Sequence, residues 1–307
     1  MIQILTIIAP LFLIIFCAAA VQRWRGLSDS WINILNNYGL NVGLPVLIFA
    51  SLAKTRFSFS AEAPLLLANS CFMVGTFCCA VITGKLLQLK RQMSLTIVLS
   101  LMFSNVAYLG IPLLTQIYGS SCVPTASLVV AVQIFWVFTL GVGYLDYVRR
   151  SSGSRIAADI GWGLIKNPLF LSVLMGIGVA STGIPIPELL MRTIDMISAS
   201  VTPTVLIVIG LFIGKSTIGK LSDWTPIFLF SLGTLIVMPA LFYCFLALLG
   251  YDPRAFHISI LQAAMPLAIT PFALAEKYGL HREFIARSIV LSTILAVVSI
   301  PWWVSWM

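Results

Sequence analysis

Uncharged apolar segments long enough to cross a lipid bilayer are the feature that most constrains how this chain can fold. A membrane-spanning helix needs about 20 predominantly apolar residues. Charged residues make up only 9% of the chain, against about 25% in a soluble domain. The sequence therefore predicts an all-α membrane protein. Nine segments of 19 to 54 residues contain no Asp, Glu, Lys or Arg: 1–22, 30–53, 63–84, 92–145, 167–187, 196–214, 224–251, 255–275 and 288–307.

The longest of these segments sets the number of predicted spans. Segment 92–145 is long enough for two spans, and its stretch YGSSCVP, Tyr118 to Pro124, is typical of a turn between them. One doubled segment among nine gives ten predicted transmembrane helices.

Basic residues predict the orientation, because loops rich in Lys and Arg stay in the cytoplasm. With ten spans, 14 basic residues fall on one side and four on the other, so both termini are expected outside. The net charge of +8 is then a signal of topology, and no nucleic-acid partner is expected. The 14 are Arg23, Arg25, Lys85, Lys90, Arg91, Arg149, Arg150, Arg155, Lys166, Lys215, Lys220, Lys277, Arg282 and Arg287, and the four are Lys54, Arg56, Arg192 and Arg254.

The two halves of the chain resemble each other. PLFL occurs at 10–13 and again at 168–171, and IPLLTQIYG at 111–119 is similar to TPFALAEKYG at 270–279. The offset stays near 158 to 160 residues. We therefore predict two five-helix repeats, 1–148 and 162–307, joined by a cytoplasmic linker at 149–161. Because five is odd, the second repeat enters the membrane from the opposite side and is inverted.

Both the fourth and the ninth predicted spans contain residues that interrupt helices. The fourth has Gly110 and Pro112, and the ninth has Pro266 and Pro271. Inverted repeats with interrupted helices at corresponding positions are typical of secondary transporters. Freed backbone groups cannot face lipid, so we expect the two breaks to meet and to present N–H groups to an anion. The alternative is that these prolines only kink their helices.

Four stretches resemble the auxin efflux carrier family, which includes plant PIN-type carriers and bacterial malonate-type transporters. They are NVAYLGIPLL, LNVGLPVLIFASL, KNPLFLSVLMGIGV and AAMPLAITPFALAEKYG, and the resemblance extends from Pro10 to the last span. It implies a fold with two crossing broken helices, with spans 1, 2, 6 and 7 as a scaffold and spans 3–5 and 8–10 as a mobile transport domain. It also implies small carboxylate substrates.

The same resemblance implies a role for one residue and a departure at another. The Asn of the first crossover contacts the substrate in PIN-type carriers, and here it is Asn105. The second crossover commonly carries a further Asn, where this chain has Thr270 followed by Pro271. The long cytoplasmic loop of many plant members is absent, which fits a protein of the bacterial inner membrane.

Polar side chains within apolar spans are the candidate ligands. An amide can both donate and accept hydrogen bonds, although such side chains also join helices to one another. The substrate-binding candidates are Asn105, Tyr108, Gly110, Pro112, Gln133, Gln262, Pro266, Thr270 and Pro271. Arg192 and Asp195 are expected to pair on one helix face.

The absent motifs narrow the function. No nucleotide-binding, protease or lipase motif occurs, so no enzyme is expected. No metal site or cofactor is expected, and the coupling ion stays open between sodium and proton. The leading hypothesis is a secondary carrier for a small organic anion, working by an elevator mechanism. The alternatives are a sodium-coupled symporter of the bile-acid type and a receptor or channel with the same fold. Partners are expected to be the carboxylate, membrane lipid and a homodimer mate at the scaffold helices.

Overall fold

Helices account for nearly all of the chain in the computed structural model, which describes residues 2–55, 58–149, 156–183, 185–216 and 224–307. Within these residues there is no β-strand, and a single isolated bridge joins two loops. Seven helices are long and apolar enough to cross a membrane. An eighth candidate is a pair of helices bent by 63°, 156–165 and 168–182. The all-α prediction is confirmed for the described residues.

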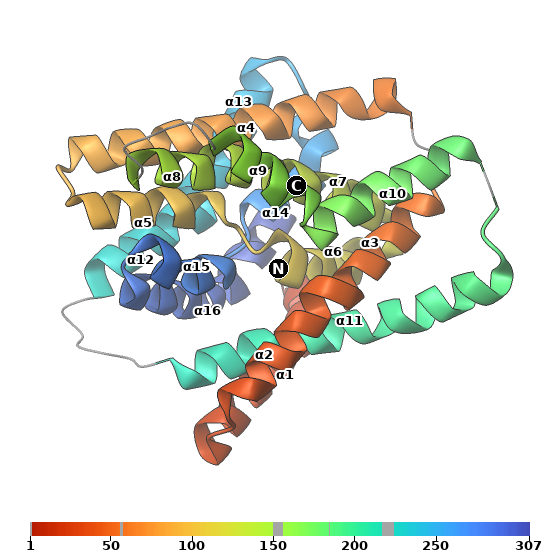
Figure 1. Cartoon of the computed structure of the whole chain (residues 1–307), viewed down its shortest axis with the longest axis horizontal. Coiled ribbons are helices and arrows are strands. Elements are labelled where there is room, and N and C mark those ends of the chain that lie inside the picture. The colour runs from red at the N-terminus through yellow and green to blue at the C-terminus, as the bar shows by residue number, and fades with distance from the viewer. Residues whose placement is uncertain (1, 56–57, 150–155, 184, 217–223) are drawn as a thin grey trace.

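The helices follow one another through short connections (Figure 1). The first half contains α1 (Ile2–Arg25), α2 (Asp29–Tyr38), η1 (Gly39–Gly43), α3 (Leu44–Ala53), α4 (Phe59–Leu86), α5 (Arg91–Met102), η2 (Val106–Gly110), α6 (Ile111–Tyr118), η3 (Ser120–Cys122), α7 (Val123–Trp136), η4 (Val137–Val142) and α8 (Gly143–Arg149). The second half contains α9 (Ile156–Ile165), α10 (Pro168–Thr182), α11 (Glu188–Lys215), α12 (Trp224–Leu232), η6 (Gly233–Val237), α13 (Met238–Leu248), η7 (Pro253–Phe256), α14 (His257–Ala263), α15 (Thr270–Tyr278) and α16 (Arg282–Trp306).

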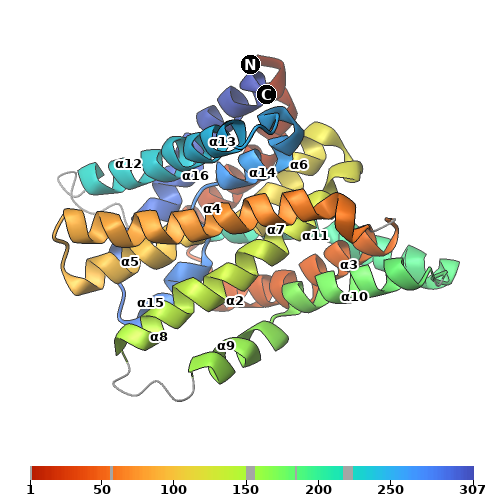
Figure 2. The same cartoon turned by 90° about the horizontal axis from the view of Figure 1, so that it is seen from above.

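The helices pack as two groups. In the first group α1 lies along α11, and α3 packs against both α10 and α11. In the second group α4 packs on α5 and α7, and α12 packs on α16 (Figure 2). The groups meet where α7 contacts α3 and α10 and where α6 contacts α1. We refer to these sets as the first group (α1–α3 and α9–α11) and the second group (α4–α8 and α12–α16).

A glycine allows the closest helix contact within the first group. A Cβ atom on Gly210 of α11 would overlap the carbonyl oxygen of Ile15 on α1. Close approach at small residues is the usual way in which membrane helices associate, since lipid is as apolar as their side chains. The buried Ile8 and Val205 on the same two helices belong to the main apolar core.

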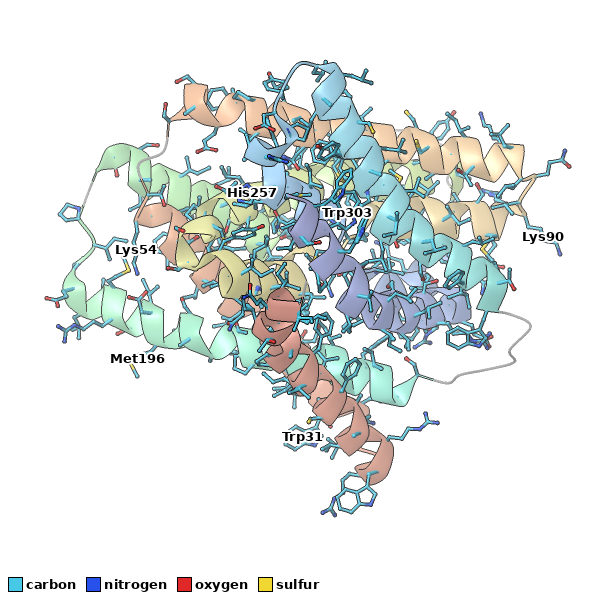
Figure 3. All side chains as sticks on the ribbon, turned by 180° about the vertical axis from the view of Figure 1, so that it is seen from behind. Trp31, Lys54, Lys90, Met196, His257 and Trp303 are labelled. Atoms are coloured by element: carbon cyan, nitrogen blue, oxygen red, sulfur yellow. The ribbon has the colours of Figure 1, made fainter. Side chains whose placement is uncertain are left out.

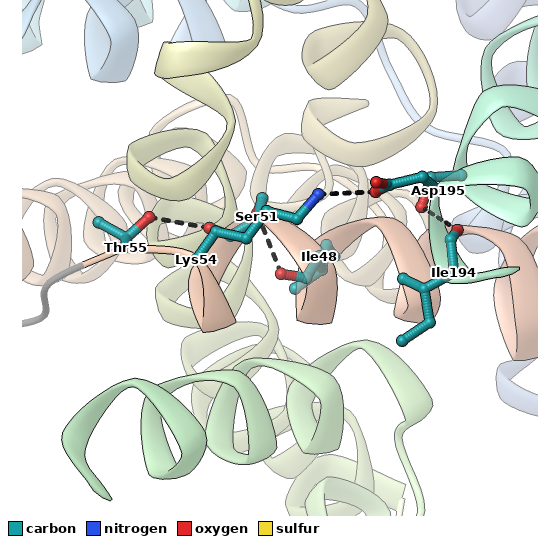
Figure 4. A network of polar contacts seen from close by, with 7 residues as sticks. Ile48, Ser51, Lys54, Thr55, Ile194 and Asp195 are labelled. Atoms are coloured by element: carbon teal, nitrogen blue, oxygen red, sulfur yellow. Dashed lines mark hydrogen bonds and ion pairs between the residues drawn. The ribbon is translucent and has the colours of Figure 1, made fainter. Parts of the chain in front are cut away.

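Ion pairs tie the segment 29–53 to α11 at both of its ends. Asp29 pairs with Lys215 at one end, and Lys54 pairs with Asp195 at 2.7 Å at the other (Figure 4). The sequence-based pairing of Asp195 with Arg192 is wrong, because Arg192 lies one helical turn from Glu188 and pairs with that carboxylate instead. These side chains are about half exposed or more, so each pair stabilises the fold by only about 0.2–1 kcal/mol.

Three π turns precede prolines in helices that continue past them. Proline lacks an N–H and its ring collides with the carbonyl four residues earlier. A π turn is wider than an α turn, so it gives the ring room. In each case the residue just before the proline donates its N–H to the carbonyl five residues behind it. The pairs are Leu44 to Gly39 before Pro45, Ile111 to Val106 before Pro112, and Met238 to Gly233 before Pro239.

The Leu235 carbonyl, which Pro239 cannot bond because it lacks an N–H, accepts a hydrogen bond from a side chain instead. The indole Nε1 of Trp303 donates to the Leu235 oxygen at 2.9 Å, and Leu235 lies four residues before Pro239. Trp303 is 1% exposed, so this bond satisfies a polar group that would otherwise be buried without a partner.

The positions of the chain ends and of two lysines can be compared with the predicted topology. Helices α1 and α16 contact each other, and the two chain ends lie close together in both views (Figures 1 and 2). Lys90, which was predicted to be cytoplasmic, and Lys54, which was predicted to lie outside, are at opposite ends of the molecule (Figure 3). Of the predicted linker, 150–155 fall outside the described residues, and 156–161 form the first part of α9.

Candidate functional site

Two unwound segments cross and pair with each other inside the second group. The first lies between α5 and η2 and the second between α14 and α15. Asn105 donates its backbone N–H to the Pro266 oxygen at 2.8 Å, and Ala268 donates to the Phe103 oxygen at 2.9 Å. These bonds form the isolated antiparallel bridge of the structure. The fourth and ninth predicted spans are thus interrupted, and the interruptions meet.

The first interruption is not where the sequence placed it. Gly110 and Pro112 were expected to break the helix, but both lie within the continuous run of η2 and α6. The π turn absorbs the proline, as described above. The chain instead leaves the helix at Phe103, whose φ and ψ are −102° and 71°, and re-enters it after Asn105.

Gln133 of α7 bonds the carbonyls that this break frees. Its side-chain Nε2 donates to the Met102 oxygen at 3.1 Å and to the Ser104 oxygen at 2.9 Å. Both amide protons are therefore used within the protein. Since Gln133 also lines the cavity described below, its side-chain oxygen is the part that remains available to a ligand.

Gln262 of α14 has a comparable position on the other side of the crossing. Its Nε2 lies 3.2 Å from the Ala126 oxygen and 3.4 Å from the Val106 oxygen. It is fully buried, and its Oε1 has no hydrogen-bond partner among the described residues. It lines a space of about 20 Å³ behind the crossing, which is enough for one water molecule.

Several donors at the crossing have no partner within the described part of the chain. They are the side-chain amide of Asn105 and the backbone N–H groups of Ala107, Tyr108, Ile269 and Thr270. Ala107 and Tyr108 lie in the first turn of the η2–α6 helix, and Thr270 begins α15. The first N–H groups of a helix lack internal partners, and the helix dipole adds a partial positive charge there.

A small cavity joins these donors. Its volume is about 70 Å³, and none of the described residues lining it is charged. The polar lining comes from both sides of the crossing, from Asn36 of α2 and from Gln133 of α7, and the rest of the wall is apolar. The lining residues are Asn36, Leu40, Phe103, Ser104, Asn105, Val106, Ala107, Tyr108, Val130, Gln133, Ile134, Val137, Leu169, Ala268, Ile269 and Thr270.

A larger cavity of about 660 Å³ adjoins the small one and shares Asn36 and Ile269 with it. Its walls come from α2, α11, α15 and α16, so it lies between the two groups of helices. Six charged side chains line it, three of each sign: Asp29, Lys215, Glu276, Arg282, Glu283 and Arg287.

Asn36 is a site residue that the sequence reasoning missed. The Tyr108 hydroxyl lies 2.9 Å from the Asn36 side-chain oxygen and 3.2 Å from its backbone oxygen, and donates to them. This contact links α2 of the first group to η2 of the second. The signal was present in the sequence, because Asn33, Asn36, Asn37 and Asn41 all fall within the predicted second span.

The predicted site residues occupy different parts of this arrangement. Asn105, Tyr108, Gln133 and Thr270 line the small cavity. Gln262 and Pro266 lie at the back of the crossing, where the Pro266 carbonyl accepts the Asn105 N–H. Pro112 and Pro271 each occupy the second position of a helix, α6 or α15, and Gly110 immediately precedes α6.

The arrangement can bind an anion by hydrogen bonds alone. Two half-helices begin at one cavity with free N–H groups, which is the usual backbone arrangement for holding a carboxylate or phosphate oxygen. Among the described residues no group of three or more His, Cys, Asp or Glu side chains could hold a metal ion.

Comparison of the sequence with known proteins finds a matching family model and several similar proteins. A family model described as membrane transport protein matches residues 3–304. The chain is 22% identical to a Rhizobium meliloti protein named "Putative malonate transporter", over 98% of this chain and 94% of that protein. It is 23% identical to an uncharacterized transporter of Methanocaldococcus jannaschii, over 90% of each chain. Auxin efflux carrier component 8 of Arabidopsis thaliana is 29% identical over 44% of this chain and 38% of that protein.

Proposed function

Because the chain belongs to the membrane transport protein family, the family of the auxin efflux carriers, we propose that it is a secondary transporter for a small organic anion. The substrate is a carboxylate, and the protein carries it across the cytoplasmic membrane of a bacterium. The likeness to a protein named as a malonate transporter supports this substrate class.

One observation carries the proposal. The Asn105 amide and four backbone N–H groups lack partners at the start of two half-helices, and they share one cavity. Unsatisfied donors deep within a membrane protein are costly unless they face water or a ligand. A carboxylate bound at the junction would satisfy them, and water would replace it when it leaves.

Ten spans in two inverted repeats are the topology we propose. The broken and bent helices each count as one span in this assignment: α5 with η2–α6, α9 with α10, and α14 with α15. The remaining seven are the long helices already described. The similar positions of Pro112 in α6 and Pro271 in α15, each followed by a closing Tyr-Gly pair, support the repeat.

An elevator mechanism is supported by where the cavity lies. Asn36 and Leu169 line it from the first group, and the crossing lines it from the second. If the first group stays fixed in the membrane as a scaffold, sliding of the second group carries the site past it. The Tyr108–Asn36 hydrogen bond then belongs to one end state and must break during the movement.

The larger cavity supports an assignment of the described conformation to one end state of the transport cycle. It opens beside Lys215, Arg282 and Arg287, which the distribution of basic residues assigns to the cytoplasmic side. With both termini outside, the substrate path leads to the cytoplasm through this cavity, so the described conformation faces inward.

Uptake by purified protein in liposomes tests the proposal. We expect uptake of a radiolabelled small carboxylate to exceed uptake by empty liposomes and to saturate with concentration. Binding without uptake would indicate a receptor, and a rate that rises linearly with concentration would indicate a channel. Either result, or no response to any small carboxylate, would contradict a carrier.

A further inference from the structure

We propose that the site selects a short carboxylate with a single negative charge and an apolar body, and that it discriminates against dicarboxylates and aromatic acids. This inference rests on the proposed transport function and deepens it by naming the substrate class. The charge, the size and the walls of the small cavity each favour such a substrate.

The small cavity can balance only a limited negative charge. The two half-helices that begin at the cavity supply about half a positive charge each, so together they balance at most one carboxylate. None of the described residues lining the cavity is a Lys, Arg or His that could balance a second. A dicarboxylate carries two charges at neutral pH, and a second charge that the cavity balances with no cation is disfavoured.

Lys215 and Arg282 line the adjoining larger cavity, and each already contacts another side chain. Lys215 pairs with Asp29, and the guanidinium of Arg282 lies over the Phe272 ring, 4.4 Å from its centre. Both side chains line the larger cavity, where three carboxylates balance the three cations.

The volume of the small cavity limits the size of the substrate. A volume of about 70 Å³ corresponds to roughly five to seven spheres of the size of a water molecule. A carboxylate with a three- or four-carbon chain fills this space. An indole or phenyl acid has about twice as many non-hydrogen atoms, so part of its ring would extend into the larger cavity, where charged side chains replace the apolar wall.

The walls of the small cavity are apolar away from the donors. Away from the donors, Leu40, Val130, Ile134 and Val137 from η1, α7 and η4 face the cavity. These side chains can bury an alkyl body at about 25 cal/mol for each Å² removed from water. They offer no hydrogen-bond donor to a second carboxylate, so the oxygens that contact them would lose part of their hydration.

Malonate and malonamate form the matched pair for the test. They have the same number of non-hydrogen atoms, but an amide replaces one carboxylate in malonamate. With the full-length protein in lipid nanodiscs, we expect calorimetric titration at pH 7.5 to show malonamate and butyrate binding at least about tenfold more tightly than malonate. Indole-3-acetate should bind more weakly than butyrate.

A pH series adds a second prediction from the same cause. Lowering the pH converts malonate to its singly charged form, so malonate binding should strengthen while malonamate binding stays nearly constant. Malonate binding as tight as malonamate at pH 7.5, with no gain at lower pH, would overturn the inference.

A designed cation supplies the converse test. Leu40→Lys places a positive charge at the cavity wall, and Leu40→Met is the matched control because it keeps a long side chain without charge. The ratio of malonate to malonamate affinity should rise at least about tenfold in the Lys variant relative to the Met variant. An unchanged ratio in two folded variants would contradict a site limited by charge.

Different results would contradict the transport function and the inference about substrate class. If no carboxylate of any charge binds or is taken up, the proposed transport function fails. If uptake is saturable but malonate or indole-3-acetate is preferred to butyrate and malonamate, the transport function stands and the inference about substrate class is wrong.

Discussion

Asn105 is the side chain with the most direct predicted role, since its amide lines the cavity and bonds no described residue. We expect Asn105→Ala to weaken substrate binding about 2- to 13-fold, the equivalent of one lost hydrogen bond of 0.5–1.5 kcal/mol. Folding should be nearly unaffected. The measurement is the dissociation constant of butyrate for equal amounts of folded protein.

The matched control for this change is Asn41→Ala. Asn41 is exposed and bonds only the Asn37 carbonyl one turn earlier, so its loss should not alter binding. Equal affinities for wild type and Asn105→Ala would show that Asn105 has a structural role.

Gln133 should matter for stability as well as for binding. Gln133→Leu removes two hydrogen bonds and leaves the Met102 and Ser104 carbonyls with fewer partners. Leaving buried acceptors unsatisfied costs about 1–3 kcal/mol, so the melting temperature should fall. Gln116→Leu, on the exposed face of α6, is the control and should melt close to wild type. A Gln133→Leu protein with an unchanged melting temperature would mean that water satisfies these carbonyls.

Sequence reasoning at this scale found some site residues and missed others for a physical reason. Asn105, Gln133 and Gln262 stand out because polar side chains are rare in apolar spans. Asn36 has the same chemistry, but it is one of four Asn residues in the predicted second span, and the local sequence does not show which of them faces the crossing. Spacing also favoured the pair Arg192–Asp195, whereas Asp195 bonds Lys54, a residue 141 positions away.

At the scale of helices, the prolines at π turns give a matched comparison. Pro112 and Pro239 each follow a π turn of the same form, but only Pro112 lies in the helix that begins at the crossing. With Pro112→Ala the restored N–H favours an α turn, which would rotate Ala107 and Tyr108 away from the cavity. We expect substrate affinity and uptake to fall roughly tenfold, and Pro239→Ala to leave affinity unchanged.

This comparison requires equal amounts of folded protein, because proline changes also act through the unfolded state. Substrate affinity is the deciding quantity, since a helix kink alone would affect stability and not binding. Equal losses of affinity in the two variants would indicate that Pro112 is an ordinary kink.

The position of the first break shows what local sequence can and cannot predict. Pro112 marks a place where regular α bonding is impossible, and the structure has a π turn there instead of the predicted break. A π turn was enough to accommodate it. The break itself lies at 103–105, where the Pro266 carbonyl and the Ala268 N–H supply the partners. Those partners come from the other half of the chain, so no local pattern could reveal them.

At the scale of the whole molecule, the distribution of basic residues predicts the orientation. In a background without the six native cysteines, Lys90→Cys should be protected from an impermeant thiol reagent in intact cells and Arg192→Cys should react. Both positions are exposed, so accessibility to the reagent depends on the side of the membrane. Rapid labelling of position 90 with protection of position 192 would reverse the proposed orientation.

The all-helical architecture was predictable because the bilayer leaves few alternatives to a helix for a long apolar segment. The assignment of a scaffold and a mobile transport domain is implied by family resemblance and not by any residue pattern, and it stays a prediction. Packing such as that of α1 on α11 depends on small residues like Gly210, whose partner helix cannot be identified from one sequence.

The central claim is that a carboxylate binds where the two broken helices cross. Methylselenoacetate carries one carboxylate on a short apolar body, and its selenium can be located by anomalous diffraction. In crystals of the protein grown with this compound, an anomalous difference map should show a selenium peak in the small cavity, between Asn105 and Thr270. A peak only in the larger cavity beside Arg282, or no peak at a saturating concentration, would contradict the claim.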